Sequence, residues 1–151
     1  MTLIRLPRFA SALVAAITVA GVVVSAQPER TTVLVYKTPT CGCCTKWVEH
    51  LEANGFKVVA QHRDDLTPLR QQHKVPARVT SCHTALVGPY VVEGHVPAAD
   101  VKRLLAEKPK VKGIAVPGMP IGSPGMEGPN PQKYNTLAFT EDGQTSVFAS
   151  H

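Results

Sequence analysis

Three cysteines stand within four positions of the segment "KTPTCGCCTKW", and this crowding constrains the fold more than any other feature. They are Cys41, Cys43 and Cys44, and the chain has one further cysteine, Cys82. A bridge between Cys43 and either of its close neighbours would be strained, so Cys41–Cys44 with Cys43–Cys82 is the least strained full pairing. A domain stapled only by disulfides would spread its cysteines to close long loops. The clustering therefore disfavours a purely structural role.

The N-terminus has the pattern of a secretory signal peptide. Two arginines precede the uncharged apolar run Phe9–Val24, and small residues up to Ala26 mark a cleavage site. An uncleaved membrane anchor is the alternative, but this run is shorter than the about 20 residues that span a bilayer. We therefore expect residues 1–26 to be removed and residues 27–151 to form one domain in the periplasm, free of the membrane. Outside the cytoplasm, paired thiols tend to oxidise.

The expected mature chain is only weakly basic. Loss of Arg5 and Arg8 lowers the formal net charge from +5 to +3, and no basic run alternates with aromatic residues. Nucleic-acid binding is therefore not expected.

Strand and helix patterns alternate along the chain up to about residue 112. β-branched runs predict strands, and apolar residues at helical spacing predict helices. The expected elements are strand 31–37, a helix from about Cys41 capped by Thr40, strand 56–62, helix 64–75, strands 84–88 and 90–96, and helix 97–108. Because strand–helix–strand forms a right-handed parallel crossover, this order predicts an α/β layered domain.

The composition changes in residues 112–133, which are rich in proline and glycine. Such a segment does not form long regular structure. Its interspersed apolar residues favour a loop packed over the domain rather than a solvated linker. Residues 134–150 then predict a β-hairpin, with Asp142-Gly143 as its turn.

The C-x-x-C motif of Cys41 and Cys44 lies between a predicted strand and a predicted helix, as in thioredoxin-like redox sites. A thiol at a helix N-terminus faces free amide groups and the positive end of the helix dipole, and both favour the thiolate. The motif therefore predicts a catalytic pair in a thiol-disulfide oxidoreductase, with Cys41 attacking and Cys44 resolving.

Cys43 favours a metal site instead, because a dithiol enzyme needs no third thiol inside its motif. Thiolates select soft ions, so we expect Cu(I). Zinc is the second choice, since structural zinc sites usually take their ligands as two separate pairs. Cys82 precedes an antiparallel strand that starts at the same sheet edge as the first helix, so it is expected to join Cys41, Cys43 and Cys44. The alternative is a lone buried cysteine.

Three other residues are weaker candidate ligands. Met119 and Met126 carry soft thioethers that suit an exported Cu(I) site, although methionine also fills gaps in cores. His83 can ligate a metal or polarise a thiol, but neighbouring residues of a strand point to opposite faces, so it need not converge with Cys82. The other histidines before the C-terminus show no paired spacing and are interpreted as ordinary: His50, His62, His73 and His95.

Four segments together resemble the CopG-type exported copper-resistance family, long labelled a domain of unknown function: "YKTPTCGCCTKWVEHLEANGF", "SCHTA", "VVEGHVPAADVKRLL" and "KGIAVPGMPIGSPGME". The resemblance runs from about Thr31 to Phe148. It implies a thioredoxin-like fold, a role in copper resistance or homeostasis, and periplasmic copper-handling proteins as partners. Its cysteines map to Cys41, Cys43, Cys44 and Cys82.

Thioredoxin-like enzymes usually place a cis-proline before their third strand. This chain has Ser81-Cys82-His83 in that region, which favours metal binding over ordinary dithiol exchange. Three functions remain open at this point: a Cu(I)-binding protein, a thiol-disulfide oxidoreductase, and a zinc-stapled interaction domain.

Overall fold

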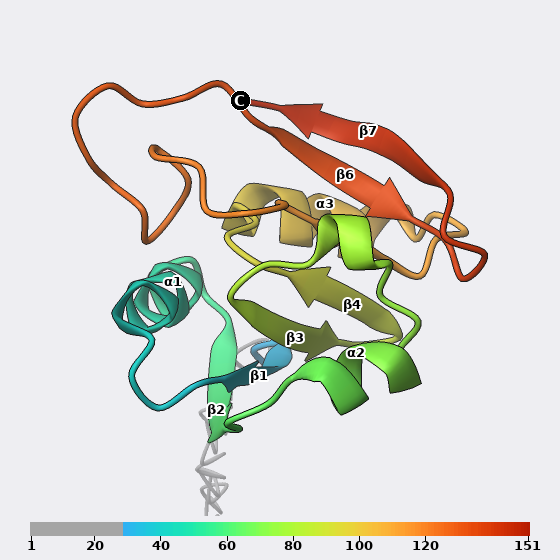
Figure 1. The fold of residues 1–151 in the computed structure, drawn as a ribbon, viewed down its shortest axis with the longest axis horizontal. Coiled ribbons are helices and arrows are strands. Elements are labelled where there is room, and N and C mark those ends of the chain that lie inside the picture. Colours follow the sequence, from blue (N-terminus) through green and yellow to red (C-terminus); the bar gives the residue numbers. More distant parts are fainter. Residues whose placement is uncertain (1–28) are drawn as a thin grey trace, which may run out of the picture.

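Seven strands form a single mixed sheet in the order β2-β1-β3-β4-β5-β6-β7 (Figure 1). The computed structural model describes residues 29–151, so the predicted signal peptide lies outside the described residues. The strands are Thr32–Lys37 (β1), Lys57–His62 (β2), His83–Val87 (β3), Tyr90–Glu93 (β4), Gly113–Ala115 (β5), Asn135–Phe139 (β6) and Thr145–Ser150 (β7). The helices are Gly42–Ala53 (α1), Thr67–Gln72 (α2) and Ala98–Glu107 (α3), with a short 3₁₀ turn at Ala77–Val79.

The predicted α/β class and element order are confirmed up to α3. β1 pairs with β2 in parallel across α1, and β3 adds antiparallel to the other side of β1. β3 and β4 form the predicted hairpin. The predicted C-terminal hairpin is also present, as β6 and β7 around Gly143, which has φ 84°.

The two faces of the sheet bury different clusters. Residues alternate between faces along a strand, so Val33 and Val35 of β1 point to one side. There they pack with Trp47 of α1 and Leu104 of α3 in the main core. A smaller cluster on the other face includes Val79, Val91 and Phe139.

Helix α1 begins where the sequence predicts, but its cap differs. Cys41, not Thr40, is the N-cap residue, with φ −72° and ψ 95°. Its sulfur accepts a hydrogen bond from the backbone N–H of Cys44, at 3.3 Å. A sulfur thus occupies the position that a hydroxyl oxygen usually takes, so the C-x-x-C motif itself starts the helix.

One short strand of the sheet falls inside the segment expected to form no long regular structure. β5 pairs in parallel with β4 and antiparallel with β6, and so joins the C-terminal hairpin to the main sheet. Gly113 allows this because a Cβ there would lie 2.1 Å from the Val91 carbonyl oxygen. The strand is three residues long, too short to give a periodic signal among prolines and glycines.

Two predicted elements, α2 and β4, are markedly shorter in the structure. Helix α2 spans Thr67–Gln72 rather than 64–75, with the Asp65 carboxylate accepting from the Thr67 N–H at 2.8 Å. β4 ends at Glu93 because Gly94 takes φ 72°, which turns the chain out of the strand.

The segment between β5 and β6 runs beside α1 (Figure 1, orange). Within residues 29–151, no helix has the length and apolar character that crossing a bilayer requires.

Candidate metal centre

Three separate segments meet at one edge of the sheet. β1 and β4 end at this edge, and β3 begins there because it runs antiparallel to both. Cys41 follows β1, Cys82 immediately precedes β3, and His95 lies two residues after β4. The topology therefore gathers sulfur and imidazole side chains from distant parts of the chain.

The structure brings the four cysteine sulfurs together. The Sγ atoms of Cys41, Cys43, Cys44 and Cys82 all lie within 4.8 Å of one another. Cys41 and Cys44 form a disulfide with their Cα atoms 5.4 Å apart, and the Cys43 sulfur is 3.5 Å from that of Cys41. Only half of the expected pairing is present, because Cys43 and Cys82 remain free thiols in side-chain contact with each other.

Cys82 is a thiol rather than a thiolate in this arrangement. Burial raises its pKa to about 12, and the neighbouring Cys43 adds to the shift. The Cys82 sulfur lies close to the start of α1, but burial outweighs the stabilisation that a thiolate is expected to gain at a helix N-terminus. A metal ion that binds here must displace a proton from this sulfur.

Two histidines share the Cys82 sulfur, and ligand atoms of all three side chains lie within 4.8 Å of one another. The Cys82 Sγ is 3.3 Å from His83 Nδ1 and 3.0 Å from His95 Nε2. Cys82 and His83 do converge, because β3 begins only at His83 and strand alternation does not govern the pair. His95, interpreted as ordinary from the sequence, contacts the Cys82 sulfur, and no spacing in the sequence indicates this contact.

His83 is fully buried and neutral. Burial is the main cause that lowers its pKa well below the usual value, and the charges of His95, Arg70 and Lys37 act in the same direction. Its ring lies 4.3 Å from that of Trp47, centroid to centroid. Its Nε2 has no hydrogen-bond partner within the described part of the chain. A neutral imidazole is chemically suited to ligation, and Nδ1 is the His83 nitrogen that faces the Cys82 sulfur.

A buried ion pair holds the segment that carries Cys82. Glu93 is fully buried and accepts from the Ser81 N–H at 2.8 Å and from the Thr84 hydroxyl at 2.6 Å. Arg70 of α2 lies 2.8 Å from the Glu93 carboxylate and donates to the Ser81 carbonyl at 2.6 Å. Both backbone polar groups of Ser81 are therefore fixed, directly before the cysteine.

The loop after β5 packs over the cysteines and histidines of the centre through Pro124 and Gly125. The Pro124 carbonyl is 2.8 Å from His95 Nδ1, which sets the ring so that Nε2 faces the sulfur. A Cβ on Gly125 would lie 2.7 Å from the Cys43 carbonyl oxygen, so only glycine permits this approach.

The two methionines flank this covering segment. Met119 is 51% exposed and follows Gly118, whose carbonyl accepts from the Ser81 hydroxyl. Met126 is half-buried and follows Gly125. Their neighbours Gly118 and Gly125 contact Ser81 and Cys43, and ligation by either thioether stays a prediction.

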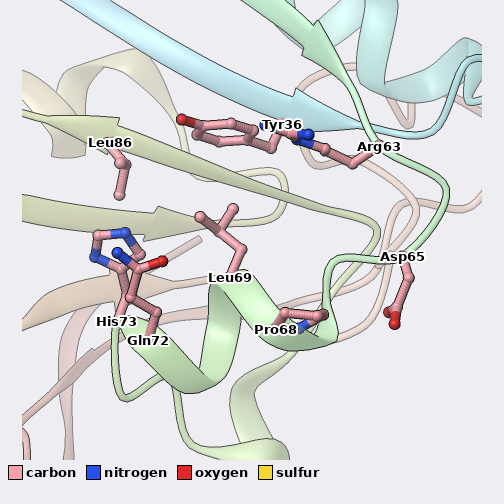
Figure 2. A pocket seen from close by; sticks show the side chains of 8 residues that line it. All are labelled: Tyr36, Arg63, Asp65, Pro68, Leu69, Gln72, His73 and Leu86. Atoms are coloured by element: carbon pink, nitrogen blue, oxygen red, sulfur yellow. The ribbon is translucent and has the colours of Figure 1, made fainter.

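A separate hollow lies on the opposite face of the sheet, beneath α2. Figure 2 shows Tyr36 and Leu86 of the strands facing Leu69 and His73, with Arg63 at the rim. No cysteine lines this hollow, so it is distinct from the sulfur cluster.

Fold and site together define a small mixed α/β protein with a sulfur-rich, histidine-flanked centre suited to a soft metal ion. A family model described as "Protein of unknown function, DUF411" matches residues 79–126. Two solved structures, "Copper resistance protein copG" forms 1 and 2, are 44% identical with TM-scores of 0.77. Each match covers 82% of this chain and 98–99% of the other. No curated protein matches the chain. The chain therefore belongs to the family of the copper resistance protein copG, as the sequence resemblance predicted.

Proposed function

We propose that this protein is exported to the periplasm and binds Cu(I) through the thiolates of Cys41, Cys43, Cys44 and Cys82, in copper resistance or homeostasis. The observation that carries the proposal is the convergence of four sulfurs from two chain segments within 4.8 Å. Thiolates are the protein ligands that Cu(I) prefers. Copper ions are then the cargo, and other periplasmic copper-handling proteins are the partners that deliver or receive them.

The donor set fits a soft monovalent ion, and the histidines extend it. His83 and His95 both contact the Cys82 sulfur, so two nitrogen ligands are available to a metal ion bound at that sulfur. The nitrogen atoms placed for this are His83 Nδ1, 3.3 Å from the Cys82 Sγ, and His95 Nε2, 3.0 Å from it. Ligation by all four sulfurs requires that two electrons and two protons first convert the Cys41–Cys44 disulfide to two thiols.

The test is a Cu(I) titration of reduced protein against a chromophoric Cu(I) chelator. Cys43→Ser removes the thiol that a dithiol enzyme does not need, so affinity or stoichiometry should fall. A Cys43→Ser variant that held Cu(I) as tightly and in the same number as the parent would refute thiolate ligation by this residue. Thr45→Ser, an exposed change on the same helix turn, serves as the matched control.

A thiol-disulfide oxidoreductase is the second candidate, because Cys41 and Cys44 form a disulfide at the start of α1. We infer a thioredoxin-like arrangement from the β1-α1-β2 crossover with the C-x-x-C motif at its helix N-terminus. A redox titration of metal-free protein discriminates the candidates. A potential below about −300 mV would mark an inert structural bridge rather than a catalyst.

A zinc-stapled interaction domain is the third candidate. Metal analysis of protein purified under reducing conditions from the cell envelope separates it from copper binding, since dominant zinc without copper would favour it. Fractionation of cells that express the full chain tests export. We expect a product without residues 1–26 in the periplasm, and a full-length product in the membrane would refute cleavage.

A further inference from the structure

A buried lysine without a carboxylate partner contacts the backbone of Cys41, one of the four clustered cysteines. Lys37 is the last residue of β1 and only 5% exposed. Its Nζ donates to the Thr38 carbonyl at 3.2 Å and to the Cys41 carbonyl at 3.4 Å. Within residues 29–151, no carboxylate forms an ion pair with it. A buried charge without an opposite charge is costly, so its retention calls for an explanation.

Lys37 lies near both a histidine and a cysteine of the centre, His83 and Cys41. Lys37 stands opposite His83 in the β1–β3 register, so the two side chains share the face that α1 covers. The carbonyl that its ammonium contacts belongs to Cys41, the N-cap residue of α1 and one of the four clustered cysteines. The ammonium therefore lies next to the place where negative charge develops when thiols lose their protons to a metal.

We propose that Lys37 is the built-in counter-ion of the metal–thiolate centre and makes it selective for monovalent over divalent ions. The inference rests on the proposed thiolate site. On any given set of thiolates, Cu(I) leaves one more unit of negative charge than a divalent ion does. A fixed buried cation stabilises the more negative complex more strongly, because Coulomb energy scales with charge and is weakly screened away from water.

The alternative is that Lys37 only ties down the carbonyls of the β1–α1 turn. Such a role would affect both classes of metal equally, since it would act through the geometry of the shared ligands. The ratio of two affinities therefore separates the roles, whereas a loss of affinity for one metal does not.

The experiment compares Cu(I) with Cd(II), a soft divalent probe for thiolates, on reduced full-length mature protein. Affinities are measured for the parent, Lys37→Met and Lys37→Gln. The glutamine can still donate to a carbonyl but carries no charge. Lys46→Met, which removes an exposed lysine from α1, is the control for net charge. Urea unfolding of each variant checks that it is folded.

We expect both neutral Lys37 variants to lose about tenfold more affinity for Cu(I) than for Cd(II). Lys46→Met should leave the ratio within about twofold, because exposed charges are screened. Equal losses for the two metals, no loss, or failure of both neutral variants to fold would overturn the counter-ion role. A parent that binds neither metal through sulfur would instead refute the proposed function.

Discussion

Replacing Glu93 with glutamine should destabilise the protein strongly, although the two side chains have nearly the same shape. Glutamine preserves the size of the side chain and can still accept from the Ser81 N–H, while the Thr84 hydroxyl can rotate to accept from its amide. The substitution removes the negative partner of Arg70. The Arg70 side chain is 19% exposed. Breaking a buried ion pair by removing one partner costs about 3–5 kcal/mol, and partial hydration of Arg70 reduces this to about 2–3 kcal/mol.

The assay is urea denaturation of oxidised, metal-free protein, with thermal melting as a second probe. A loss of this size lowers Tm by roughly 10 °C for a domain of this length. Glu141→Gln is the matched control, because Glu141 is 56% exposed and pairs at the surface with Lys74, so its loss should cost about 0.5 kcal/mol or less.

A double-mutant cycle with Arg70→Met tests the cause of the loss. The double variant removes the orphaned cation, so its cost should be at least about 1 kcal/mol smaller than the sum of the two single costs. Strict additivity, or a Glu93→Gln variant whose stability lies within about 0.5 kcal/mol of the parent's, would refute the view that a buried ion pair fixes the segment carrying Cys82.

Three further predictions concern the centre and its support. Trp47→Phe should cost about 1–3 kcal/mol in urea denaturation, because the indole Nε1 bond to the Val96 carbonyl (2.8 Å) is lost; unchanged stability would contradict this. Gly125→Ala should destabilise by about 1–3 kcal/mol, since a methyl group would meet the Cys43 carbonyl and the residue has φ +85°; a neutral effect would mean that the loop shifts freely. The pKa of Cys82 is about 12, so below that pH Cu(I) must displace its proton, and affinity should rise about tenfold per pH unit for this proton alone. Cys82→Ser should lower that slope by about one, and an unchanged slope in the chelator titration would exclude Cys82 as a ligand.

The sequence predicts most of the α/β framework because its elements have strong local signals. β1 is a β-branched run between polar residues, and α3 carries Val101 and Leu104 on one face behind Pro97. The clustering of Cys82 with the other cysteines follows from topology, since the start of an antiparallel strand shares an edge with the end of β1.

The remaining features depend on contacts that have no local pattern. β5 is a strand because β4 and β6 supply hydrogen bonds on both sides of it, and its own three residues do not predict this. His95 enters the centre because Gly94 ends β4 and the Pro124 carbonyl orients its ring. These contacts join distant segments of the chain, so the spacing of residues in the sequence does not predict them.

X-ray absorption at the copper edge tests the central claim most directly, applied to reduced protein loaded with Cu(I). Convergence of the four cysteine sulfurs predicts a first shell dominated by sulfur, which loses sulfur in Cys82→Ser. A first shell of nitrogen and oxygen only, or a sulfur shell that Cys82→Ser leaves unchanged, would contradict a shared thiolate centre built from two distant segments of the chain.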